Sequence, residues 1–160
     1  MYEIFDHTAD LGLRIRAASL DRLFEEAAEA LFAVLVVHLD QVQPAQQKTL
    51  RLQAGTLEDL LHDWLSELLV LFALEKLVGR QFAVQLDRQQ VPVAGPPETM
   101  ASLMGQPIYL TQEVLDATIW GDRLDPARHH PGPEVKAVTY HGLRVEQHPD
   151  GWLAQVILDL

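Results

Sequence analysis

The side chains best suited to chemistry are carboxylates near the two ends of the sequence. Asp10 belongs to the segment HTADLG, residues 7–12, and Asp159 is next to Leu160, whose α-carboxylate is a third acidic group. Carboxylates that meet repel one another unless a cation lies between them. Their hard oxygen atoms suit Ca²⁺, Mg²⁺ or Mn²⁺. The residues alone leave two alternatives open, a shared divalent-cation site or separate solvated charges.

Both aspartates lie at the ends of predicted strands. Residues 11–17 alternate between apolar side chains and glycine or arginine, which is typical of a half-buried strand. The segment WLAQVILDL, residues 152–160, alternates in the same way and places Asp159 opposite its apolar face. The preceding HPDG, residues 148–151, predicts a hairpin turn. Asp10 therefore lies where a loop enters a strand, a common position for a binding residue.

Two amphipathic helices must support these strands. Residues 20–36 carry apolar side chains at i, i+3, i+4 and i+7 spacing, and Ser19 is suited to be their N-cap. A second helix is predicted to begin at Thr56 and to end before Gly79. Its apolar stripe is wide, which indicates burial on more than one side.

The remaining pattern completes an α+β reading of the chain. Further strands are predicted at residues 48–54, 82–86, 113–120 and 134–147. Residues 88–112 contain four prolines and two glycines and are expected to form a long excursion between two strands, with a short helix near 98–104. Two helices among about seven strands, without strict βαβ alternation, predict a single layered domain over residues 1–160. In it the two long amphipathic helices pack on a mostly antiparallel sheet.

Composition excludes several classes of function. With 23 acidic and 12 Lys or Arg residues, the formal net charge is −11, so direct nucleic-acid binding is not expected. The absence of cysteine excludes disulfides, thiolate zinc sites and a cysteine nucleophile. The N-terminal segment lacks a signal-peptide pattern, and the longest apolar stretch is interrupted by Glu67 and Glu75. We therefore expect a cytoplasmic protein without membrane contact.

Familiar catalytic signatures are missing from the sequence. It has no glycine-rich phosphate loop and no GxSxG motif. A zinc site is conceivable from four of the seven histidines, namely His7, His129, His130 and His141. No pair has i, i+4 or HxH spacing, however, which favours ordinary hydrogen-bonded histidines.

Four segments together are similar to one known family. They are DHTADLG (6–12), HDWLSELLVLF (62–72), EVKAVTYHGLRV (134–145) and GWLAQVILDL (151–160). Their order and separation across nearly the whole chain resemble the archease family. Relative to that family, the segment at about 88–112 resembles an insertion.

The resemblance implies an accessory role rather than an enzymatic one. Archeases assist the RtcB-type RNA ligase of tRNA splicing, promoting guanylylation of the ligase histidine and repeated turnover. The family binds a divalent cation, usually calcium, and its ligands correspond by motif to Asp10, Asp159 and Leu160 here. Lys136 matches a residue needed for partner activation. The resemblance also leaves His7 as a second residue that orients Asp10.

Two other classes of function stay open at this stage. One is a metal-dependent hydrolase that uses Asp10 and Asp159 together with His129 or His130. The other is a general protein chaperone or adaptor, whose clients would extend beyond RNA ligation.

Overall fold

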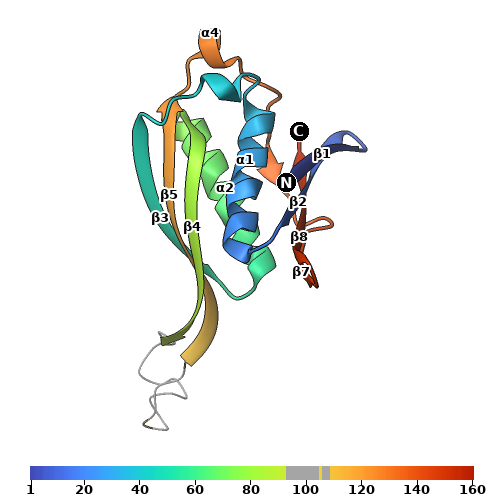
Figure 1. Cartoon of the computed structure of the whole chain (residues 1–160), viewed down its shortest axis with the longest axis vertical. Coiled ribbons are helices and arrows are strands. Elements are labelled where there is room, and N and C mark those ends of the chain that lie inside the picture. Colours follow the sequence, from blue (N-terminus) through green and yellow to red (C-terminus); the bar gives the residue numbers. More distant parts are fainter. Residues whose placement is uncertain (93–104, 106–108) are drawn as a thin grey trace.

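Two antiparallel sheets enclose a pair of helices in this computed structural model, which describes residues 1–92, 105 and 109–160 (Figure 1). One sheet lies on each side of the helical layer. The described residues form eight strands, two long helices, one short α-helix and one 3-10 turn. The predicted α+β class with mostly antiparallel strands is confirmed, but the strands divide between two sheets.

The first sheet contains both ends of the chain. Its strands are β1 (Tyr2–His7), β2 (Asp10–Ala17), β6 (Ala137–Val138), β7 (Arg144–His148) and β8 (Gly151–Asp159). They follow the order β1-β2-β8-β6, and β7 also pairs with β8. His148 lies opposite Gly151, which confirms the hairpin predicted from HPDG. The strand β8 thereby joins the N-terminal hairpin to the segment that follows Lys136.

The second sheet has the order β3-β5-β4 and is formed by β3 (Gln46–Ala54), β4 (Leu77–Pro92) and β5 (Tyr109–Arg123). The outer edge of β4 lies against the first helix, where two carboxylates accept its free backbone N–H groups. Glu25 accepts from Val84 and Asp21 from Leu86, both at 2.9 Å. Side chains that occupy an edge in this way oppose pairing with another strand.

Helix α1 (Leu20–Leu35) and helix α2 (Leu57–Glu75) begin at the predicted N-caps. Ser19 Oγ accepts from the N–H of Arg22, and Thr56 Oγ1 accepts from the N–H of Asp59. The predicted end of the second helix at Gly79 is wrong. Lys76 ends it with a left-handed φ of 56°, and Gly79 already belongs to β4.

Two other predictions need correction. Residues 134–147 do not form one strand, because a turn closed by the Leu143 N–H and the Tyr140 carbonyl, with Gly142 at φ 63°, separates β6 from β7. The expected excursion at 88–112 is shorter, since 88–92 pair with 109–113 as ends of β4 and β5. The short helix expected near 98–104 lies outside the described residues.

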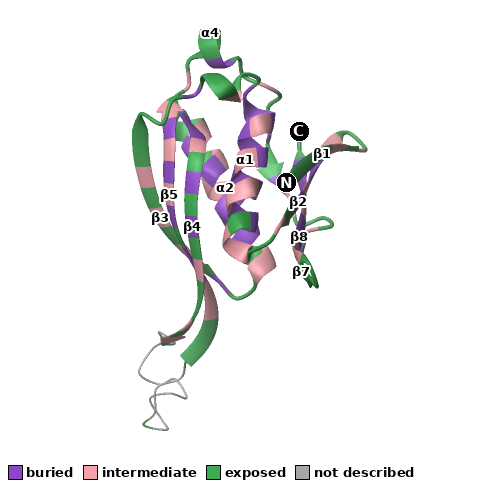
Figure 2. Cartoon of the chain, in the orientation of Figure 1, coloured by how far each residue is buried: buried purple, intermediate pink, exposed green. Residues whose placement is uncertain are grey.

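The core lies between the helices and the sheets, where Figure 2 shows the buried segments of both layers. Trp64 of α2 is fully buried and donates its indole N–H to the carbonyl of Phe24 in α1 at 3.0 Å. Its ring also meets Phe82 of β4 edge to face, with 6.3 Å between centroids. Within the described part of the chain, no helix has the length and apolar content needed to cross a membrane.

Truncation of Trp64 should therefore be the costliest single change in this core. We expect Trp64→Ala to lower the free energy of unfolding by about 3–5 kcal/mol, because it leaves a cavity between three elements. Trp64→Phe should cost about 1–2 kcal/mol, since the ring volume is largely kept and one hydrogen bond is lost. Urea unfolding measures both values. Leu74→Ala, at a side chain that is 79% exposed, is the control; an equal loss there would contradict the prediction.

Candidate functional site

The first sheet brings the two predicted aspartates to neighbouring positions. Strand β2 pairs with β8 so that Leu11 lies opposite Leu158. Asp10 and Asp159 are the next residues along these strands, one on each, and adjacent strands are separated by about 5 Å. Leu11 and Leu158 pack toward the core. Because side chains alternate along a strand, both aspartates belong to the opposite, outward face of the sheet.

His7 belongs to the same end of the sheet. It lies opposite Asp10 across the β1–β2 hairpin, with 3.9 Å between His7 Nδ1 and Asp10 Oδ2. This Nδ1 atom is buried and has no hydrogen-bond partner among the described residues. The ring of His141 lies 5.4 Å away, measured between centroids. The hairpin thus places an imidazole nitrogen without a hydrogen-bond partner near the Asp10 carboxylate, at a distance too long for a hydrogen bond.

The turn that joins His7 to Asp10 has an unusual backbone. Thr8 and Ala9 both have positive φ, 21° and 66°. Two-residue hairpin turns commonly require positive φ, but residues other than glycine and asparagine adopt it at a cost of about 1–3 kcal/mol. The pairing of β1 with β2 holds this conformation, so the spacing of His7 and Asp10 is fixed by the strands behind them.

Sequence reasoning missed the packing behind this hairpin. A Cβ atom at Gly12 would clash with the Phe5 ring, which lies across the glycine. The guanidinium carbon of Arg14 lies 4.6 Å from the centre of the same ring, a cation–π arrangement. A glycine inside a strand pattern was the available signal, because it indicates the close approach of another group. Here the approaching group is the Phe5 ring, whose contact with Gly12 fixes β1 beside β2.

Lys136 approaches Asp159 through its backbone. Its N–H donates to the Asp159 carbonyl at 2.8 Å, and the next residue, Ala137, lies opposite Asp159 in the sheet. The neighbouring Val135 is buried, whereas Lys136 itself is exposed. Its ammonium group forms no ion pair within the described ranges 1–92 and 109–160. The backbone of Lys136 therefore adjoins Asp159, and its side chain is exposed to solvent.

A second feature that sequence reasoning missed is the contact between α2 and the segment after β6. His62 Nε2 lies 3.0 Å from the Val138 carbonyl, and Nδ1 lies 3.1 Å from Asp63 Oδ1. The Tyr140 ring stacks on this imidazole at 3.9 Å between centroids. Desolvation, with the nearby carboxylates of Asp63 and Asp59, raises the pKa of the Tyr140 hydroxyl. The stack anchors the chain just before His141.

The structure divides the four histidines of the conceivable zinc site into two pairs, His7 with His141 and His129 with His130. His129 is fully buried, and its Nδ1 accepts from the Asp125 N–H at 2.9 Å. The carbonyls of His129 and His130 accept from the segment after α1 rather than from the Asp10 hairpin. No group of three or more His, Cys, Asp or Glu side chains able to hold a metal ion occurs in the described residues. The four-histidine site is therefore wrong, and the described residues do not bring Asp10 and Asp159 together with His129 or His130 as the hydrolase arrangement requires.

The donors at the sheet end suit a hard cation. Asp10 and Asp159 supply side-chain carboxylates, and Leu160 follows directly with its α-carboxylate. Oxygen donors of this kind favour Ca²⁺ or Mg²⁺ over softer metals. The unsatisfied His7 nitrogen beside Asp10 is a further polar atom that lacks a protein partner. The donor chemistry fits a hard divalent cation and the register makes the two aspartates backbone neighbours, but His7, Asp10 and Asp159 do not form a three-side-chain metal group among the described residues, so other oxygen donors must complete a coordination shell.

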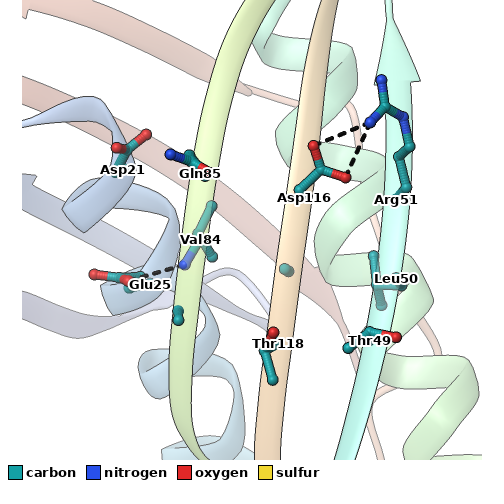
Figure 3. Close-up of a pocket in the computed structure, with 11 residues that line it drawn as sticks. Asp21, Glu25, Thr49, Leu50, Arg51, Val84, Gln85, Asp116 and Thr118 are labelled. Carbon is teal, nitrogen blue, oxygen red and sulfur yellow. Dashed lines mark hydrogen bonds and ion pairs between the residues drawn. The ribbon is translucent and has the colours of Figure 1, made fainter.

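A separate groove of about 780 Å³ lies over the second sheet and the beginning of α1 (Figure 3). Its charged groups are already engaged within the protein. Arg51 pairs with Asp116 at 3.2 Å, and Glu25 accepts from the backbone of β4. The groove contains none of the residues at the Asp10 end of the first sheet.

Comparison with known proteins gives one consistent result. The sequence matches the model of the Archease protein family (MTH1598/TM1083) over residues 2–160. It is 35% identical to protein archease of Pyrococcus abyssi and 34% identical to that of Thermococcus kodakarensis, covering 99% of this chain and 98% of each relative.

Two solved structures have the same arrangement. The solution structure of Methanobacterium thermoautotrophicum protein 1598 has a TM-score of 0.70 and 25% identity, covering 99% of this chain and 98% of that one. The crystal structure of an archease from Thermotoga maritima, described as a possible chaperone, has a TM-score of 0.55 and 18% identity. The match covers 100% of this chain and 98% of that one, and at this identity it shows the fold alone. With a family match and relatives that span the whole chain, this protein belongs to the archease family.

Proposed function

We propose that this protein activates an RtcB-type RNA ligase of tRNA splicing in the cytoplasm. In this role it promotes guanylylation of the ligase histidine and allows the ligase repeated turnover, without ligase activity of its own. The observation that supports the proposal is that the backbone positions of Asp10, Asp159 and Lys136 adjoin at one end of the first sheet. Membership of the archease family supports it.

The cation site has a defined part in this proposal. Asp10, Asp159 and the Leu160 α-carboxylate would hold a divalent cation, with calcium as the expected ion. When bound, it neutralises the repulsion between these groups. His7 orients Asp10, and the strained hairpin keeps both groups in place. The cation would cancel two of the three negative charges there, so that the exposed ammonium of Lys136 is the positive group offered to a partner.

The overall charge favours action through a protein partner. A formal net charge of −11 repels RNA over most of the surface, so this protein is not expected to bind the RNA substrate itself. The exposed ammonium of Lys136 would instead suit contact with an acidic group of a protein partner. We propose that the ligase supplies such a group near its nucleotide site.

A general chaperone is the second candidate, because the similar Thermotoga maritima protein is described as a possible chaperone. Such a protein would suppress aggregation of clients unrelated to RNA ligation. Chaperones of that kind usually expose contiguous apolar surface.

A ligation assay tests the proposal directly. Limiting ligase, GTP, Mn²⁺ and broken RNA are incubated with and without this protein, and ligated product is counted per ligase molecule. We expect less than about one turnover without the protein and at least about tenfold more with it, a barrier difference of about 1.4 kcal/mol or more. Equal product in both reactions would refute ligase activation. Suppression of citrate synthase aggregation in that case would favour the general chaperone.

A further inference from the structure

A pair of exposed histidines lies in two short segments that belong to neither sheet. His38 precedes the 3-10 turn η1 (Leu39–Gln41), and His130 ends the short helix α4 (Pro126–His129). Their rings are 4.8 Å apart between centroids and nearly perpendicular, at 87°. Neither imidazole has a hydrogen-bond partner within the described part of the chain, unlike the buried His129 that precedes His130. Two unengaged imidazoles thus share one small surface.

The backbone holds the two histidines in place. The N–H of Val37 donates to the His130 carbonyl at 2.7 Å, and the N–H of His38 donates to the His129 carbonyl at 2.9 Å. A bridge between Val36 and Pro131 continues this short antiparallel contact. The two segments can approach this closely because Gly132 lacks a side chain; a Cβ there would clash with the Val34 carbonyl.

The ring separation matches that of two imidazoles on one metal ion. With metal–nitrogen bonds of about 2.0–2.1 Å, imidazoles at bond angles of about 90–110° have ring centres roughly 4.5–5.2 Å apart. The observed 4.8 Å lies within this interval. Imidazole nitrogen suits zinc, copper and nickel, whereas calcium and magnesium prefer oxygen. This pair therefore differs in chemistry from the carboxylates at the sheet end.

We propose that His38 and His130 form a second metal site, specific for a first-row transition ion such as Zn²⁺, Ni²⁺ or Cu²⁺. The two imidazoles provide two nitrogen ligands, and water completes the coordination. The negative charge of the protein raises the local concentration of cations at its surface. A bound ion joins the chain after α1 to the chain after β5, two segments that are far apart in sequence.

Calorimetric titration with Zn²⁺, in excess Ca²⁺ to occupy the carboxylates, tests this site. We expect one Zn²⁺ per chain, and His38→Ala and His130→Asn should each weaken binding about tenfold or more. Asparagine is used at position 130 because it tolerates the positive φ of 55° there. The exposed His148, which pairs with Glu146 at 3.3 Å, provides the matched control His148→Ala, with unchanged affinity.

The electron paramagnetic resonance spectrum of the Cu²⁺ complex provides an independent readout. Coupling to two nitrogen nuclei is expected in the native protein and to one in either variant. Zn²⁺ affinity that is unchanged in His38→Ala would overturn the proposal. Loss of binding in His141→Ala alone would also overturn it, because the ion would then lie beside His7.

Discussion

Replacement of Asp10 by asparagine should reduce stimulation of the ligase to the level of the ligase alone. Asparagine keeps the shape of the side chain and one oxygen ligand but removes its negative charge, and carboxylate charge largely sets the affinity of calcium sites. We therefore expect the dissociation constant for Ca²⁺ to rise at least about 100-fold. Calorimetric titration with Ca²⁺ and the multiple-turnover ligation assay measure the two effects separately.

Asp6→Asn is the matched control for this variant. Asp6 lies opposite Leu11 and His7 lies opposite Asp10, so Asp6 belongs to the other face of the same hairpin. It carries the same charge but should affect neither Ca²⁺ binding nor stimulation. Both variants should unfold within about 0.5 kcal/mol of the native protein, because neither carboxylate is part of the core. Full stimulation by a folded Asp10→Asn variant would remove Asp10 from the proposed mechanism.

Local patterns predicted the helices well because the information is local. The apolar spacing of residues 20–36 and the caps at Ser19 and Thr56 depend on neighbours within a few positions. The alternation of 134–147 misled for the same reason. It is compatible with one strand, and only the left-handed φ of Gly142 and the pairing with β8 divide it into two.

The length of the β4–β5 hairpin was hidden by polar side chains. Residues 88–92 lack an apolar period, so their pattern gave no indication of a strand. They are paired through cross-strand contacts instead. Arg88 meets Glu113 at 2.8 Å, and Gln90 donates to the Thr111 hydroxyl at 3.0 Å. Such pairs stabilise a ribbon without burying apolar surface, and their partners become apparent only once the register is known.

The candidate site illustrates the same limit more sharply. Residue types indicated that Asp10 and Asp159 could bind a cation, but their meeting depends on the register of β2 with β8, which joins the two ends of the chain. Family resemblance supplied that pairing before the structure did. The contact between His38 and His130 had no comparable signal, since it depends on two irregular segments that pack after α1 and β5.

Lys136→Ala should separate partner activation from cation binding. The ammonium group of Lys136 is exposed and forms no ion pair in the described part of the chain, so it is not needed for folding or for holding the carboxylates. Its backbone bond to Asp159 persists in the variant, because the donor is the main-chain N–H. We therefore expect the Ca²⁺ affinity to be unchanged. Stimulation of the ligase should fall by about tenfold or more, since a charge-assisted contact with the ligase contributes about 1.5–3 kcal/mol.

The matched control for this last prediction is Lys48→Ala, which removes a lysine of β3 in the second sheet that pairs with Glu75 of α2 at 3.0 Å. That variant should stimulate the ligase fully. Lys136→Arg should recover part of the activity, because the charge is restored while the geometry of the donor group differs. If Lys136→Ala weakens Ca²⁺ binding as much as stimulation, the lysine acts by supporting the cation site. If both Lys136→Ala and Lys48→Ala stimulate the ligase fully, the side chain of Lys136 does not contact the ligase.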